Sequence, residues 1–185
     1  RVLVVTKSDG VLRDAELARR TASVSMTITT LDPRVARRIE PGAPDPALRL
    51  KALRILSGMG VRCSVRLDPV IPFINDSEES VRSVVRAAAE AGALHLVSST
   101  FKARWDSLGR ISRAFPGIAG RLRSLYMAGS RISGYLYLPE RVRRRYMRMV
   151  REAAMDYGLT FATCREGFPE MQTAPSCDGS HLIPR

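Results

Sequence analysis

The chain has 185 residues, of which 45% are hydrophobic and 26% charged, and its formal net charge at neutral pH is +12. This length is enough to bury one sizeable core, so we expect a single domain over residues 1–185. No apolar run reaches the roughly 18–20 residues that span a bilayer, no signal peptide is visible, and three scattered cysteines do not form a disulfide scaffold. We therefore expect a cytoplasmic protein with no membrane partner.

Arginine dominates the positive charge. Only Lys7, Lys51 and Lys102 among the 30 basic residues are lysines, and Asn75 and Gln172 are the only side-chain amides. A strong positive charge suits a nucleic-acid partner, because phosphate neutralisation dominates such binding. Scarce amides and abundant arginine also fit a thermophile or a genome bias, so nucleic-acid binding stays open.

Short β-rich runs alternate with amphipathic stretches along the chain. The runs predict strands over residues 2–6, 24–29, 61–67, 94–98 and 159–163, with helices between them. This alternation is typical of a parallel sheet covered by helices. Since a closed barrel has eight strands, we expect an α/β fold, a partial (β/α) barrel with parallel strands in chain order, incomplete at its amino-terminal side. Its open edge favours self-association.

Helix ends are marked by capping residues and glycines. Asp45 followed by Pro46 predicts an N-cap and the first helical residue, and Asp76 with Glu79 predicts an acidic capping box. Glycines that can close a helix in a left-handed conformation precede three strands: Gly60, Gly92 and Gly158.

The second half of the chain is expected to be mainly helical. Residues 103–137 predict helices without defined boundaries, and residues 139–157 predict one amphipathic helix. We divide the domain into barrel strands and helices over 1–102 and a helical cover segment over 103–185. The apolar face of the helix comprises Val142, Tyr146, Met149, Val150 and Ala153. Arginines occupy its other faces: Arg141, Arg144, Arg145, Arg148 and Arg151.

Polar residues follow the predicted strands, and ligands bind at the carboxyl ends of parallel strands. The candidates are Lys7, Thr27, Arg66, Asp68 and Ser98, and we expect Lys7, Thr27, Arg66 and Ser98 to converge around a nucleoside-sized cavity. Arg66 and Asp68 share one face of a strand and form either a ligand site or a structural ion pair. Lys7 is either a ligand-binding cation or a strand-end lysine whose ammonium reaches water.

Five segments carry a family likeness: VTKS (5–8), SMTITTLD (25–32), EPGAPDPALRLKALRILSGMGVRCSVRLDPVIPFIND (40–76), CREGF (164–168) and CDGSHLIP (177–184). Together they resemble the radical S-adenosylmethionine enzymes, in their spore photoproduct lyase-like or "DNA repair photolyase" branch. The resemblance implies that the complete protein binds S-adenosylmethionine and a 4Fe-4S cluster and performs 5′-deoxyadenosyl radical chemistry. The cluster motif Cys-x-x-x-Cys-x-x-Cys is absent from this chain. We therefore interpret the chain as the carboxyl-terminal part of such an enzyme, inactive by itself and without a cluster.

The resemblance also implies site residues. It assigns Lys7 and Thr27 to S-adenosylmethionine and places Arg66 and Asp68 in the strand that lines the same pocket. The segment SRISGYLYLP (130–139) departs from the family, since Arg131 is followed by Ile132 where the family has tyrosine. A thymine-dimer substrate therefore does not carry over, and the substrate stays open.

The remaining chemical groups give weaker signals. Cys164, Cys177 and His181 could form an auxiliary metal site, but they lack the close cysteine pairing of common zinc sites. Cys63 is expected to be a buried core residue, or a hydrogen-atom donor if it faces the pocket. The turn at Glu40 is expected to be structural, because no acid-base partner is evident.

Two functions follow from the sequence. The first is part of a radical S-adenosylmethionine enzyme, lyase-like and acting on DNA or nucleotides, to which this chain supplies the cofactor-side barrel strands. The alternative is a non-catalytic, Arg-rich α/β module that binds nucleic acid or a protein partner. The direction of Lys7 and Arg66 separates them, because solvent-facing side chains would favour the binding module.

Overall fold

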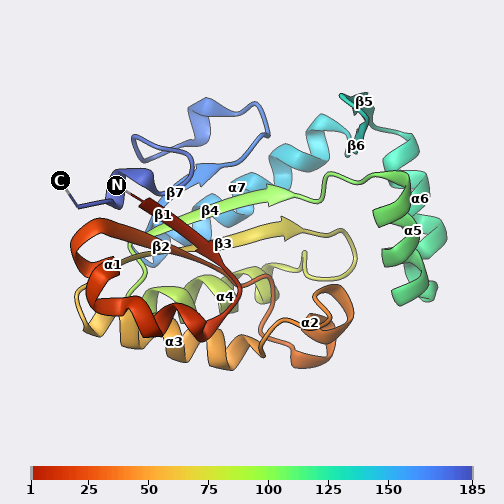
Figure 1. Ribbon diagram of the computed structural model, residues 1–185. Helices are drawn as coiled ribbons and strands as arrows, with labels where there is room; N and C mark the ends of the chain where they lie inside the picture. Colours follow the sequence, from red (N-terminus) through yellow and green to blue (C-terminus); the bar gives the residue numbers. More distant parts are fainter. Residues whose placement is uncertain (1, 185) are drawn as a thin grey trace.

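A computed structural model describes residues 2–184. Its main feature is a five-stranded sheet in the order β1-β2-β3-β4-β7, in which all neighbouring strands are parallel (Figure 1). The strands are β1 (Val2–Thr6), β2 (Ala22–Thr27), β3 (Arg62–Val70), β4 (His95–Thr100) and β7 (Thr160–Thr163). The predicted partial barrel with strands in chain order is confirmed, although several strand boundaries differ from the predicted ones by one to three residues.

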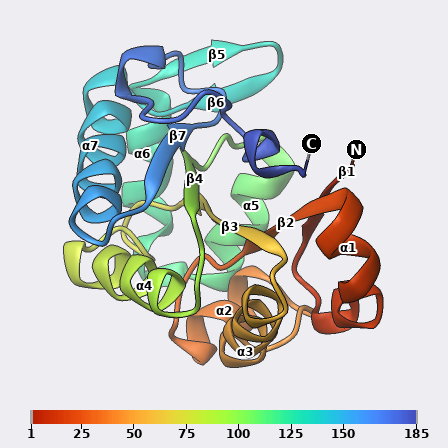
Figure 2. The same cartoon turned by 90° about the vertical axis from the view of Figure 1, so that its left-hand side faces the viewer.

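Helices cover the outer side of this sheet. Figure 2 shows a curved sheet with four helices on its convex side: α1 (Ala15–Thr21), α3 (Pro46–Gly58), α4 (Glu78–Glu90) and α7 (Glu140–Asp156). The carboxyl-terminal segment, with the short helices η3 (Pro169–Met171) and η4 (Ser180–Leu182), runs past β7 to the concave side. Between residues 2 and 184, no helix combines the length and the apolarity that crossing a membrane requires.

Other elements stand at the carboxyl ends of the strands. These are α2 (Pro33–Ile39), α5 (Trp105–Ala114), η2 (Pro116–Ile118), α6 (Ala119–Met127) and a hairpin of β5 (Ser130–Ile132) and β6 (Tyr135–Tyr137) (Figure 1). After the carboxyl end of β1, η1 (Asp9–Asp14) leads into α1. The loops and elements that follow the strands therefore surround one edge of the sheet, where parallel folds bind ligands.

The hairpin corrects the expectation of helices throughout residues 103–137. Ser133 and Gly134 both have positive φ, 49° and 81°, as a tight two-residue hairpin turn requires. The two strands have only three residues each, and β5 is exposed, so the alternating hydrophobic signal of a strand is missing. Gly129 is also required, because a Cβ there would lie 1.9 Å from the carbonyl oxygen of Tyr137.

Local capping explains where the helices begin. Asp45 caps α3 as predicted, since its carboxylate accepts a hydrogen bond from Ala47 N at 3.0 Å. The predicted capping box of Asp76 and Glu79 is wrong: Ser77 caps α4 by accepting from Ser80 N at 3.1 Å. Asp76 instead accepts a hydrogen bond from Tyr146 of α7 at 2.5 Å. The glycines before three strands have left-handed φ as predicted: Gly60, Gly92 and Gly158.

The long helix α7 matches the predicted helix, but its buried face is different. Tyr146, Val150 and Ala153 are buried, while Val142 and Met149 are only partly buried. Arg143 belongs to the buried face and is 8% exposed. A buried arginine needs a partner, which the candidate site supplies.

Candidate functional site

The two faces of the sheet differ in chemistry. Alternate residues of a strand point to opposite faces. Val24, Cys63, Leu96 and Phe161 face the helices and belong to the apolar core. The residues that alternate with them along each strand face the concave side. Their buried polar side chains form a row on that face, which includes Ser25 of β2 and others on β3 and β4. The concave face is therefore the side on which a polar ligand can be recognised.

Strand register brings three predicted site residues together on the concave face. Thr27 pairs with Arg66 on adjacent strands, and Lys7 directly follows Thr6, the last paired residue of β1, so it lies at the same carboxyl end of the sheet. Asp68 follows Arg66 by two residues and lies on the same face, at the carboxyl edge. The structure thus places Lys7, Thr27, Arg66 and Asp68 on one polar edge.

Ser98 does not join this group. It pairs with Leu67 and Thr163 and lies on the helix-covered face, fully buried, where its Oγ donates to the Leu67 carbonyl at 2.7 Å. The following residue, Ser99, lies on the concave face, and its Oγ donates to Asp68 Oδ1 at 2.5 Å. Strand alternation therefore assigns Ser99, and not Ser98, to the candidate site.

Arg66 and Asp68 form a partly buried ion pair. Their side chains are 14% and 21% exposed, and Arg66 Nη2 lies 2.7 Å from Asp68 Oδ2. Burial by itself lowers the pKa of Arg66, but the adjacent Asp68 carboxylate and a contribution from Cys164 raise it overall. The Arg66 guanidinium is therefore held in the charged form at the lip of the concave face, where the pair can also contact a ligand.

A second ion network surrounds Lys7. Its Nζ lies 3.2 Å from Glu40 Oε1, and Glu40 Oε2 lies 2.5 Å from Arg49 Nη1. The turn at Glu40 was expected to be structural, with no evident acid-base partner; the structure supplies partners, since Glu40 pairs with Lys7, which follows β1, and with Arg49 of α3. Arg49 lies nearby in the sequence, but Lys7 is distant, and no local pattern could have identified it as a partner.

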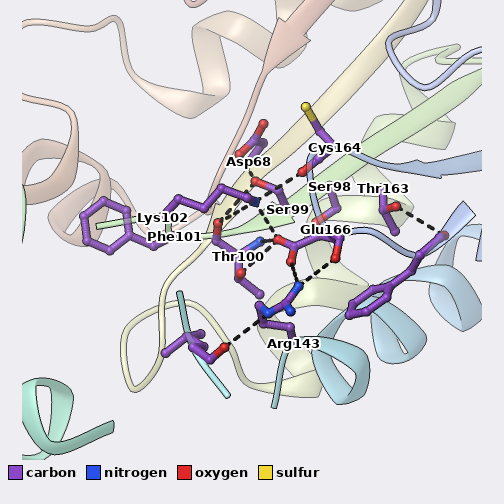
Figure 3. Close-up of polar contacts among 12 residues, drawn as sticks. Asp68, Ser98, Ser99, Thr100, Phe101, Lys102, Arg143, Thr163, Cys164 and Glu166 are labelled. Atoms are coloured by element: carbon purple, nitrogen blue, oxygen red, sulfur yellow. Dashed lines mark hydrogen bonds and ion pairs between the residues drawn. The ribbon is translucent and has the colours of Figure 1, made fainter. Parts of the chain in front are cut away.

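A third network is almost fully buried beside α7 (Figure 3). Glu166 lies 2.7 Å from Lys102 Nζ and 2.9 Å from Arg143 Nη1, and its side chain is 0% exposed. It also accepts hydrogen bonds from Thr100 N at 2.7 Å and Thr100 Oγ1 at 2.9 Å. Sequence reasoning missed this network, whose residues join the exit of β4, α7 and the loop after β7.

The cysteines and His181 do not assemble a metal site within the described part of the chain. Among residues 2–184, no group of three or more His, Cys, Asp and Glu side chains is arranged to hold a metal ion. Cys164 is partly buried at the end of β7, Cys177 is exposed, and His181 Nδ1 lies 2.6 Å from Ser176 Oγ. Cys63 faces the helices, and burial raises its pKa to about 12. It therefore does not face the pocket, as a hydrogen-atom donor would have to.

Polar atoms without partners line the concave face below the charged edge. Four such buried atoms have no hydrogen-bond partner among the described residues: Ser23 Oγ, Ser25 Oγ, Ser64 Oγ and His95 Nε2. Burial lowers the pKa of His95 to about 4, so the ring is neutral. Its Nδ1 lies 2.8 Å from Thr160 Oγ1, which donates to the Leu94 carbonyl, so Nδ1 carries the proton and Nε2 is an acceptor.

The carboxyl-terminal segment lies against this polar row. A Cβ on Gly179 would lie 2.9 Å from Ser64 Oγ, and the His181 ring stands edge-on to His95 with centroids 4.9 Å apart. The nucleoside-sized cavity expected around Lys7, Thr27, Arg66 and Ser98 stays a prediction. A cavity of about 420 Å³ lies on the other side of β1, between Val2, Val4 and helix α1.

Comparisons with known proteins show which proteins this chain resembles. No family model matches the chain. An uncharacterized protein of Mycobacterium tuberculosis is 32% identical over 161 residues, which are 80% of this chain and 44% of that protein. An uncharacterized protein of Methanocaldococcus jannaschii is 35% identical over 77 residues, 40% of this chain and 30% of that protein. The chain thus spans less than half the length of these relatives.

The solved structures define the class of fold. A point mutant of spore photoproduct lyase matches with a TM-score of 0.65 and 17% identity, over 89% of this chain and 51% of that chain. Spore photoproduct lyase in complex with a dinucleoside spore photoproduct matches with a TM-score of 0.60 and 16% identity over the same shares. The chain therefore has the fold of about half of spore photoproduct lyase.

Proposed function

We propose that this chain is the carboxyl-terminal part of a radical S-adenosylmethionine enzyme and supplies the cofactor-side wall of its barrel. One observation carries the proposal: Lys7, Thr27, Arg66 and Asp68 lie at the carboxyl edge of one parallel sheet, in a fold shared with spore photoproduct lyase. The buried polar atoms below this edge add unused hydrogen-bonding capacity.

The residues of this edge fit S-adenosylmethionine. The Lys7 ammonium suits the carboxylate of the methionine moiety, and the Thr27 hydroxyl suits a neighbouring polar group. Asp68 accepts hydrogen bonds from ribose hydroxyls, with Arg66 and Ser99 fixing its orientation. When bound, the cofactor supplies the 5′-deoxyadenosyl group for radical chemistry; the protein orients it and excludes water.

The 4Fe-4S cluster does not fit these residues. Its ligands would be three cysteines, but Cys63 is buried against the helices and the described residues form no metal-binding group. The described residues therefore offer no ligand set for the cluster, and we assign its ligands to the rest of the complete enzyme.

Calorimetric titration with S-adenosylmethionine tests the proposal. Lys7→Ala should weaken binding about tenfold or more, because a charged hydrogen bond contributes roughly 1.5–3 kcal/mol. Lys51→Ala is the matched control, since Lys51 is exposed on α3. A wild-type chain that binds no S-adenosylmethionine, or equal affinities of the two variants, would overturn the assignment.

A second candidate function rests on arginine–aromatic pairs near the same edge. Arg121 lies over Phe73 at 4.3 Å and Arg123 over Trp105 at 6.0 Å, and these two aromatic side chains are 37% and 51% exposed. Exposed rings with adjacent cations suit single-stranded nucleic acid, whose bases stack on aromatic side chains. The Arg-rich chain would then be a nucleic-acid-binding module.

Anisotropy of a labelled single-stranded oligonucleotide separates the two functions. Trp105→Ala should lower affinity about tenfold, since one stacked base contributes roughly 1–3 kcal/mol. Arg86→Ala, on exposed α4, is the control for loss of charge alone. Binding that both variants weaken equally would indicate nonspecific attraction to the charge of the chain.

The edge of β1 offers a partner surface. Within residues 2–184 this strand pairs with β2 alone, and Val2 and Val5 are 52% and 54% exposed. We propose that this edge mediates self-association by accepting a further strand. Sedimentation velocity at increasing concentration should show association that Val5→Lys abolishes, and a monomer at all concentrations would contradict it.

A further inference from the structure

Glu40 is the acidic residue of the turn over residues 40–44, and its two carboxylate oxygens have different partners. Glu40 lies between α2 and α3, and its side chain is 5% exposed. Oε2 pairs with Arg49, while Oε1 lies 3.2 Å from Lys7 Nζ and accepts from Thr29 Oγ1 at 3.3 Å. One carboxylate thus connects a buried guanidinium to an ammonium at the concave edge.

Arg49 fixes the position of this carboxylate. It is 1% exposed, and its Nε donates to the Pro44 carbonyl at 2.8 Å, inside the same turn. Its Nη1 donates to the Thr27 carbonyl at 3.0 Å as well as to Glu40. The guanidinium therefore ties Glu40 to the end of β2, the strand that carries the candidate site residue Thr27.

Lys7 is the most exposed member of this network. Its side chain is 47% exposed, and a free lysine side chain has about 2 kcal/mol of rotamer entropy to lose on binding. An ammonium has three donors. Glu40 engages it on one side and leaves donors for a ligand. The network of Lys7, Glu40 and Arg49 has two cations and one carboxylate, so it presents a net positive charge at Lys7.

We infer that Glu40 is a positioning residue, which holds the Lys7 ammonium for the carboxylate of S-adenosylmethionine. This inference rests on the proposed function. Glu40 does not touch the cofactor; it acts by keeping the Lys7 ammonium near the end of β2 at the carboxyl edge of the sheet, so that less side-chain freedom is lost when the ligand binds.

Two ligands separate positioning from a general structural role. 5′-Methylthioadenosine contains the nucleoside of S-adenosylmethionine but lacks its amino-acid carboxylate. Glu40→Gln should weaken binding of S-adenosylmethionine about fivefold, which is an effect of the size that contact networks show, and leave 5′-methylthioadenosine unchanged. Glu90→Gln is the matched control, because Glu90 forms an exposed ion pair with Arg86 on α4.

A double-mutant cycle tests whether Glu40 acts through Lys7. In a Lys7→Ala background, Glu40→Gln should change S-adenosylmethionine affinity by less than about twofold, since the partner is gone. Glu40→Asp keeps a countercharge for Arg49 but moves it away from Lys7, so it should bind with intermediate affinity. This variant carries the test if circular dichroism shows that Glu40→Gln is unfolded.

The outcomes distinguish the inference from the proposed function. A wild-type chain that binds neither ligand overturns the proposed function. Wild-type binding with equal losses for both ligands in Glu40→Gln, or additive losses in the cycle, overturns the role of Glu40 alone. Loss confined to S-adenosylmethionine and absent without Lys7 supports it.

Discussion

Glu166→Gln should be among the most destabilising conservative substitutions in this chain. The Glu166 side chain is 0% exposed and is the only anion paired with Lys102 and Arg143 among the described residues. A glutamine has the same shape as glutamate but no charge. The NH2 end of its side-chain amide must face one of the two cations. Removing one partner of a buried ion pair costs about 3–5 kcal/mol.

That loss is large compared with the stability of a domain, which is about 5–15 kcal/mol. For a chain of this size, it corresponds to a fall in the midpoint of thermal unfolding of about 6–20 °C. Urea unfolding followed by far-ultraviolet circular dichroism measures the same loss as a lower midpoint. Adding Lys102→Met should recover part of the stability, because one of the two unpaired cations is then removed.

The control is Glu170→Gln. Glu170 is 56% exposed and pairs with Arg144 at 2.6 Å, and exposed ion pairs contribute at most about 1 kcal/mol. The reasoning is refuted if Glu166→Gln and Glu170→Gln destabilise the chain equally, or if the Glu166→Gln variant unfolds within about 1 kcal/mol of the wild type.

Three further predictions concern titration, reactivity and capping. Burial lowers the pKa of His95 from 6.5 to about 4, so its contribution to stability is complete above pH 6.5 and is lost as the pH falls to 4. The loss of stability is roughly 3 kcal/mol. The urea midpoint should therefore vary less between about pH 7.5 and 4.5 in His95→Gln than in the wild type. The same dependence of the midpoint on pH in both proteins would contradict this prediction. A thiol reagent should modify exposed Cys177 first and Cys164 more slowly, and Cys63 only after unfolding, since burial raises its pKa to about 12; rapid native modification of Cys63 would show the packing to be wrong. Asp45→Ala should destabilise the chain by about 1 kcal/mol in urea through loss of the α3 cap, and a neutral result would show that the cap is dispensable.

The fold was predictable because its signals are local. Apolar runs, glycines such as Gly60 and Gly158, and the Asp45 cap each mark one boundary, and together they give the order of strands and helices. The hairpin around Gly134 was missed, because its strands are too short and too exposed to show alternation.

The site was only partly predictable, for two physical reasons. Strand β4 is buried on both faces, so polarity does not reveal which residues point to the concave side, and Ser98 was chosen where Ser99 lies there. Lys7 and Glu166, which pair with Glu40 and Arg143, come from distant parts of the chain. An isolated charge in a sequence does not show whether it is solvated or paired.

Strands β4 and β7 are neighbours in the sheet although α5, α6 and the hairpin lie between them in the chain. The entropy of closing such a loop grows only logarithmically with its length. The exposed hairpin turn at Ser133 and Gly134 in this segment can therefore be lengthened or exchanged while Ser98 and Thr163 keep their places in adjacent strands. Because this segment stands beside the polar edge, substitutions in it can alter which molecules reach the site without changing the sheet that holds it.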